Sequence, residues 1–175
     1  MQYDIKGKGV IILRVLGIDP GYATIGFGIL DFDKNRITVV DYGVIETPKN
    51  EGFPQRLVMI EDGIHALIDK YSPDEVSIEE LFFAKNVTTG INVAHARGVI
   101  LATVVKRIGN IFEYTPLQIK QALTGYGRAD KHQIQSMVKT LLGLKSIPRP
   151  DDAADALAVA LTHIQSRNFK DAFRV

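Results

Sequence analysis

The fold is decided by the segment Val15-Leu16-Gly17-Ile18-Asp19-Pro20-Gly21, an apolar run that ends on a carboxylate and a turn. We expect a buried strand over Val10–Ile18, because this stretch is apolar and rich in β-branched residues. Two further strand patterns, Thr24–Phe32 and Ile37–Glu46, follow after short links. Short links favour antiparallel neighbours, so the first three strands are predicted to form a meander.

Beyond the meander, helix and strand patterns alternate along the chain. The predicted elements are a helix over Gln55–Tyr71, a strand over Glu75–Glu79, a helix over Ile91–Ile108, a strand over Ile111–Tyr114, and helices over Pro116–Leu123, over Asp130–Leu142 and from Asp151 or Asp152 to about Arg167. This order predicts an α/β fold. Its five-stranded mixed sheet has three antiparallel strands followed by parallel crossover strands, flanked by helices.

Composition limits the classes of protein that this chain can belong to. Its 175 residues are 46% hydrophobic and include no cysteine. The length suits one domain, and the lack of cysteine excludes disulfides, thiolate metal sites and a thiol nucleophile. No apolar run approaches the roughly 20 residues that span a bilayer, and residues 1–9 lack the pattern of a signal peptide. We therefore expect a cytoplasmic protein that does not bind membranes.

Charge is unevenly distributed along the chain, although the net charge is only +1. Residues 97–149 carry nine Lys or Arg side chains against two acidic ones, Glu113 and Asp130. Asymmetry of this kind indicates a face that binds a polyanion. Charge alone gives equal weight to an ordinary solvated surface with scattered basic side chains.

Three acidic sites bound the apolar elements. Asp19 ends the first strand, Glu79 ends the fourth, and Asp152 and Asp155 begin the last helix, three residues apart on one helix face. If the first and fourth strands are neighbours, these carboxylates converge. Carboxylates are the hard oxygen ligands that magnesium and manganese prefer, and such a group can hold two ions that share a phosphate.

Each acidic site also has a purely structural interpretation. Asp19 can start the turn at Pro20, Asp152 and Asp155 can cap a helix and favour its dipole, and Glu79 can be a surface residue. Any one of these interpretations alone is preferable to metal binding. The three sites together favour a shared metal site.

Four motifs in order resemble the RuvC family of Holliday junction resolvases. They are Val15–Gly21, Ser77–Asn86, Ala94–Gly98 and Asp151–Ala158, and the resemblance runs from about Leu13 to about Ser166. It implies a ribonuclease-H-like fold and a metal-dependent endonuclease that cuts four-way DNA junctions by paired symmetric nicks in recombination and DNA repair. It also implies a homodimer that cooperates with the RuvAB branch-migration complex. The nuclease domain is then 13–167, between an N-terminal extension 1–12 of no assigned function and a loose C-terminal tail 168–175.

The resemblance assigns roles to individual residues. It implies that Asp19, Glu79, Asp152 and Asp155 bind two Mg²⁺ ions in each active site, with Mn²⁺ as an alternative. It implies that Phe82 stacks on an unpaired base, although the residues themselves leave open whether Phe82 or Phe83 is exposed. Lys120 and Lys131 match lysines that face DNA and assist cleavage. The predicted DNA-binding residues are Phe82, Lys85, Lys120, Arg128 and Lys131.

Two other functions also fit parts of this sequence. Sugar kinases and actin-like ATPases also begin with Asp-x-Gly, as at Asp19, but this chain is short for their two lobes and shows no second phosphate loop. A junction-binding protein without cleavage is disfavoured, because all four carboxylates are present.

Ala94, Gly98 and Ala102 form a stripe of small residues that faces either the sheet or a second subunit.

Overall fold

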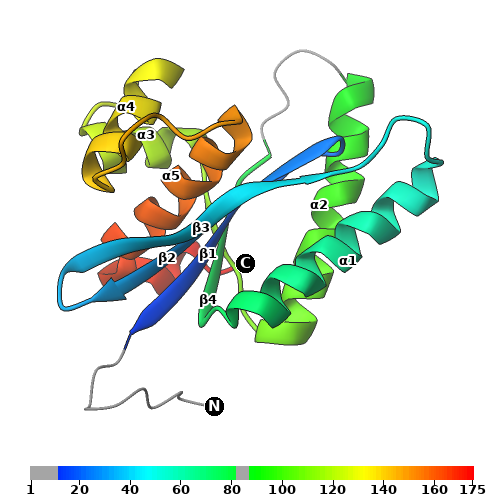
Figure 1. Ribbon diagram of the computed structural model, residues 1–175, viewed down its shortest axis with the longest axis horizontal. Coiled ribbons are helices and arrows are strands. Elements are labelled where there is room, and N and C mark those ends of the chain that lie inside the picture. The colour runs from blue at the N-terminus through cyan, green and yellow to red at the C-terminus, as the bar shows by residue number, and fades with distance from the viewer. Residues whose placement is uncertain (1–11, 82–86) are drawn as a thin grey trace.

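The computed structural model describes residues 12–81 and 87–175 (Figure 1). The strands are β1 (Leu13–Asp19), β2 (Thr24–Asp33), β3 (Arg36–Glu46), β4 (Glu75–Glu79) and β5 (Phe112–Tyr114). The helices are α1 (Phe53–Tyr71), α2 (Val87–Ile108), α3 (Pro116–Thr124), α4 (Lys131–Leu141) and α5 (Asp151–Gln165), with a final 3-10 helix η1 (Arg167–Phe173). Within the described residues, no helix combines the length and the apolar character that crossing a bilayer requires.

The five strands form one mixed sheet in the order β3-β2-β1-β4-β5. β1, β2 and β3 pair antiparallel, whereas β4 runs parallel to both β1 and β5. This topology confirms the predicted fold class. Ile18 lies opposite Ile78, so the next residues along, Asp19 and Glu79, lie at the same edge of the sheet.

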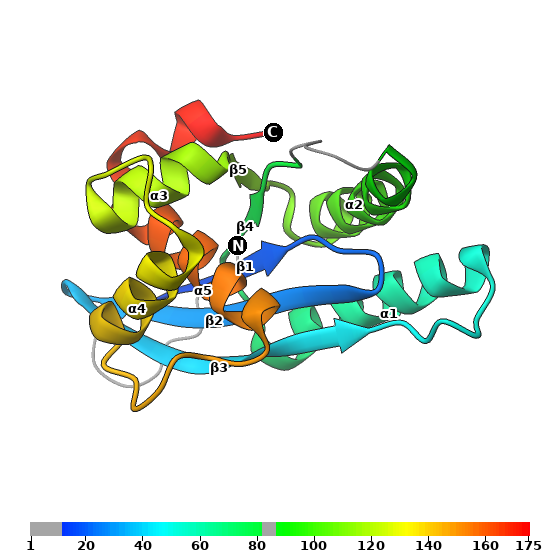
Figure 2. The same cartoon turned by 90° about the horizontal axis from the view of Figure 1, so that it is seen from above.

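The sheet separates two hydrophobic cores. Helices α1 and α2 cover one face, and α5 lies on the other with α3 and α4 beside it (Figures 1 and 2). Leu16 and Ile18 belong to the core under α1 and α2, while Val15 packs in the core under α5. Because side chains alternate along a strand, Asp19 shares the face of Val15 and Gly17. Asp19 therefore points toward α5.

Two glycines let α5 lie directly on the sheet. A Cβ atom at Gly17 would collide with the carbonyl oxygen of Ala156, and one at Gly26 would collide with that of Asp152. The helix backbone thus occupies the space that side chains fill elsewhere. This close approach fixes the first turns of α5 beside the end of β1.

Two sequence-based expectations are wrong. Helix α2 begins at Val87 rather than Ile91, so the loop before it is shorter than predicted. The C-terminal tail is not loose, because η1 spans most of it and the Phe173 ring stacks on Tyr114 with centroids 4.8 Å apart. The backbone of Val175 also donates a hydrogen bond to the Ile111 carbonyl at 3.0 Å.

Candidate active site

Four carboxylates from three parts of the chain meet at one end of the sheet. Asp19 and Glu79 leave the ends of the neighbouring parallel strands β1 and β4, and α5 brings Asp152 and Asp155 over them. The charges of the other three carboxylates all raise the pKa of Asp19. The convergence predicted from the sequence is therefore present in the structure.

The pKa values of these groups show how strongly negative charge is concentrated here. Burial, followed by the charges of Glu79, Asp155 and Asp152, raises the pKa of Asp19 to about 8. Burial and the charge of Asp155 raise the pKa of Glu79 to about 7, against the opposing effect of Lys131 and Lys120. Burial likewise raises the pKa of Asp155. Perturbed carboxylates in one cleft are typical of functional sites.

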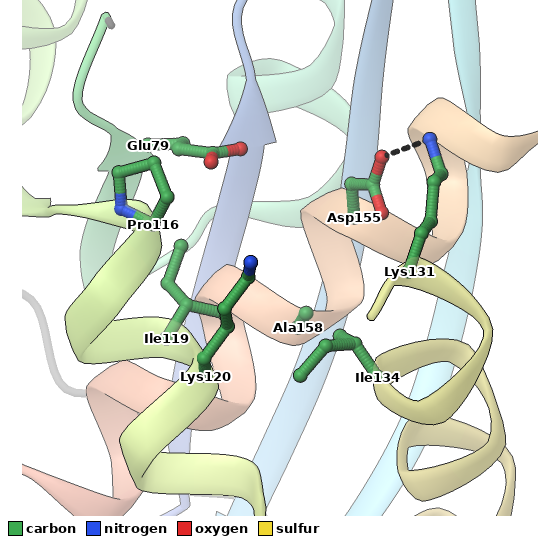
Figure 3. Close-up of a pocket in the computed structure, with 8 residues that line it drawn as sticks. All are labelled: Glu79, Pro116, Ile119, Lys120, Lys131, Ile134, Asp155 and Ala158. Carbon is green, nitrogen blue, oxygen red and sulfur yellow. Dashed lines mark hydrogen bonds and ion pairs between the residues drawn. The ribbon is translucent and has the colours of Figure 1, made fainter. Parts of the chain in front are cut away.

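A cavity of about 170 Å³ opens beside the carboxylates. Its charged lining consists of Glu79 from β4, Lys120 from α3, and the hydrogen-bonded pair of Asp155 from α5 and Lys131 from α4 (Figure 3). Apolar side chains complete the wall, namely Pro116, Ile119, Ile134 and Ala158. The cavity thus presents negative and positive groups to one space, as binding of a phosphodiester beside a cation requires.

Lys131 contacts the carboxylates of α5 directly. Its Nζ donates to Asp155 Oδ2 at 2.9 Å and lies 3.5 Å from Asp151 Oδ2. Burial lowers the pKa of Lys131, but its hydrogen bond to Asp155 and the charges of both aspartates raise it overall. Sequence reasoning did not identify Asp151 as part of the site, although its place at the start of the same helix was a usable signal. Asp151 also pairs with Arg149.

The four carboxylates suit a divalent cation. They offer only hard oxygen ligands, and the raised pKa values of Asp19 and Glu79 show negative charge that the described side chains do not neutralise. Among residues 12–81 and 87–175, no three acidic or histidine groups lie close enough to form a finished cation cage. Asp19, Glu79, Asp152 and Asp155 therefore stay the predicted metal ligands.

The remaining predicted DNA-binding residues lie in different places. Phe82 and Lys85 fall outside the described residues. Arg128 is exposed on the connection between α3 and α4, not in the cavity. Lys120 and Lys131 are thus the predicted basic residues that the structure brings into the cavity.

Comparison with known proteins gives this arrangement a family. The family model described as "Crossover junction endodeoxyribonuclease RuvC" matches residues 15–163. The chain belongs to the RuvC family. A RuvC from Alkaliphilus oremlandii is 53% identical over 161 residues, which are 92% of this chain and 98% of that protein. One from Caldicellulosiruptor saccharolyticus is 55% identical over 156 residues, covering 88% and 93%.

Solved structures agree with this assignment. Thermus thermophilus RuvC in complex with Holliday junction substrate superposes with a TM-score of 0.86 at 32% identity, covering 93% of this chain and 99% of that one. The yeast mitochondrial Holliday junction resolvase has a TM-score of 0.66 at 15% identity, covering 91% and 82%, and shows the shared fold alone. The ribonuclease-H-like fold predicted from the sequence is confirmed.

Family membership fixes the class of reaction. RuvC proteins are endonucleases that hydrolyse DNA at crossover junctions, act in recombination and repair, and depend on metal. The match covers nearly the whole chain, which excludes the kinase-like and actin-like interpretation.

Proposed function

We propose that this chain cuts four-way DNA junctions by paired symmetric nicks and that Asp19, Glu79, Asp152 and Asp155 hold two divalent ions in each active site. Magnesium is the expected ion, and manganese is the alternative. The observation that supports this most is the meeting of four carboxylates, two of them with pKa values raised to about 8 and about 7, beside a cavity lined by two lysines.

The carboxylates and the lysines have different roles in phosphodiester hydrolysis. When bound, the ions supply an activated water and stabilise the charge on the attacking and leaving oxygens. The carboxylates position that chemistry at the end of the sheet. Lys120 and Lys131 line the same cavity, where their ammonium groups can bind the scissile phosphate. No nucleophile from the protein is needed.

The functional unit in this proposal is a homodimer. Ala94, Gly98 and Ala102 are exposed on α2, and a Cβ atom at Gly98 would meet nothing within 4 Å. Ile91 and Val105 continue this outward face and are 50% and 44% exposed. A second copy packed here would give a two-fold dimer that matches a two-fold junction. Resemblance to the family further supports cooperation with RuvAB and a nuclease domain over 13–167.

A nicking assay on a synthetic four-way junction tests the proposal. With Mg²⁺, we expect two nicks at symmetric positions in opposite strands, and no cutting of a linear duplex with the same arm sequence. Excess EDTA is expected to stop the reaction and leave the junction bound. Binding without any nicking in Mg²⁺ or Mn²⁺ would show a junction-binding protein instead, and unpaired cuts would contradict the dimer.

A further inference from the structure

The connection between α3 and α4 is a rigid loop. Gly125 ends α3 in a left-handed conformation, with φ +69, and its N–H donates to the Gln121 carbonyl at 2.8 Å. At the other end, the Asp130 side chain accepts from the Gln133 N–H at 2.8 Å, and the Gln133 side chain accepts from the Asp130 N–H. Both ends are therefore held by helix caps.

The backbone of Tyr126 is fixed within this loop. Its N–H donates to Thr124 Oγ1 at 3.1 Å, and its carbonyl accepts from Thr124 Oγ1 at 3.0 Å and from the Ala129 N–H at 3.2 Å. The following residue, Gly127, packs so closely on Leu117 that a Cβ atom there would collide with the Leu117 side chain. The position of the Tyr126 Cα is thus determined from several sides.

The side chain of Tyr126 has no such support. It is 57% exposed, and Leu117 beside the loop is 54% exposed. Among the described residues, no ring or cation stacks on the Tyr126 ring. A tyrosine presented to solvent by a preorganised loop is a typical recognition element, because binding costs little additional ordering.

The surroundings of Tyr126 indicate the chemistry of its partner. The helices before and after the loop carry Lys120 and Lys131, which line the cavity, and the exposed Arg128 lies two residues further along. Figure 2 shows this connection on the same side of the sheet as the beginning of α5. The loop also belongs to residues 97–149, where basic side chains greatly outnumber acidic ones. A polyanion with flat aromatic groups fits both features.

We propose that Tyr126 stacks on a nucleobase that is exposed where the arms of the bound junction separate, while Arg128 contacts a nearby phosphate. This inference rests on the proposed function and adds a DNA contact distinct from the carboxylates. Stacking on a tyrosine tolerates any base, so the contact recognises the open branch point rather than a sequence. In a continuous duplex the bases are stacked on one another, and the ring has no such partner.

Equilibrium binding in EDTA, which prevents cleavage, tests the proposal. We expect Tyr126→Ala to weaken binding to a four-way junction about 5- to 160-fold, the range given by loss of one base–aromatic stack. Binding to a linear duplex is expected to stay unchanged. Tyr126→Phe keeps the ring and should bind like the parent protein, whereas Tyr126→Leu, which is apolar without a ring, should bind like the alanine variant.

Salt dependence separates stacking from charge. Tyr126→Ala is expected to leave the slope of log K against log salt unchanged, whereas Arg128→Ala should reduce it by about 1, because one phosphate contact is lost. Phe169→Ala is a matched control, since Phe169 is 76% exposed beyond the far end of α5 and should not affect binding.

Three results would overturn the inference: unchanged junction binding by Tyr126→Ala, an equal loss on junction and duplex, or full rescue by leucine. The second would indicate packing against a sugar of intact duplex. If the parent protein itself failed to bind the junction, the proposed function would fail as well. Circular dichroism and thermal unfolding confirm that each variant is folded.

Discussion

Carboxylates lie at both ends of strands β1 and β4, but only those at the starting end are paired with donors from the chain. At the starting end, the Arg14 guanidinium donates to both oxygens of Asp31 at 2.7 and 2.9 Å, and the Arg14 N–H donates to Asp74 at 2.7 Å. Glu75 is likewise paired there, 2.7 Å from Nε2 of the buried His163. At this end, each of these carboxylates has a partner from the chain itself.

At the finishing end, negative charge exceeds the cations that the described chain supplies. Asp19 and Glu79 are half-buried, with pKa values raised to about 8 and about 7, and Lys131 pairs with Asp155 instead. The comparison indicates that carboxylates paired with an arginine stabilise contacts between elements of the fold. Carboxylates left without such a partner are the ones that we propose to bind cations from solution.

Removing one unmatched carboxylate tests this contrast most strongly. We expect Asp19→Asn to reduce nicking in Mg²⁺ by at least about 10³-fold, because metal stabilisation of the transition state is worth several kcal/mol. Junction affinity should change little. Asp31→Asn makes the same change at the matched end and is expected to leave the rate within about 2-fold. Comparable nicking by Asp19→Asn and the parent protein would refute the metal assignment.

Removing the ion pair at the starting end should lower the free energy of unfolding instead of the rate of nicking. Arg14→Met leaves Asp31 without its bidentate partner, and we expect the free energy of unfolding to fall by about 2–4 kcal/mol. Urea denaturation measures this. Arg149→Met, which removes an exposed pair with Asp151, is the control and should cost less than about 1 kcal/mol. Equal losses in the two variants would remove the distinction between the ends.

The unmatched end also predicts a pH dependence of stability without metal. A raised carboxyl pKa means that the unfolded chain releases its proton first, so folding becomes less favourable as pH rises from about 4 to about 8. Asp19→Asn removes this effect, and we expect it to stabilise the metal-free protein by about 1–3 kcal/mol at pH 8 and by less at pH 5.5.

Urea denaturation at both pH values in EDTA measures this difference. Saturating Mg²⁺ at pH 8 should abolish the advantage of Asp19→Asn, because bound metal stabilises the parent protein. An advantage that shrank with rising pH would contradict the buried, repelling carboxylates.

The smallest expected effect concerns one titration. Lys131 lowers the pKa of Glu79, so Lys131→Gln is expected to raise it further. An NMR titration of the Glu79 side-chain carboxyl carbon in metal-free protein measures the shift. Lys145→Gln, which changes an exposed lysine, serves as the control. A downward shift in Lys131→Gln would show that Lys131 does not act on Glu79 through its charge.

The sequence predicted the sheet and the meeting of its acidic residues because both follow from local rules. Strand alternation and parallel pairing place Asp19 and Glu79 at one edge, and the three-residue spacing of Asp152 and Asp155 places them on one helix face. The DNA-contacting role of Phe82 stays a prediction, as does that of Lys85, because both lie outside the described residues.

Other features depend on contacts that spacing does not reveal. The start of α2 was missed because Val87-Thr88-Thr89-Gly90 contains poor helix formers, which tertiary structure overrides. Arg14 and Asp74 are 60 residues apart in the chain, so their contact could not be read from the sequence. The ion pair between Lys131 and Asp155 likewise requires two helices to be docked.

The final residues have a practical consequence for handling the protein. β5 is the last strand of the sheet, and its outer side is paired with the backbone at Arg174 and Val175. An uncovered edge strand invites pairing with another molecule and hence aggregation. Truncation before Phe173 would expose this edge, and a purification tag fused after Val175 would crowd it. A tag at the opposite terminus avoids both problems.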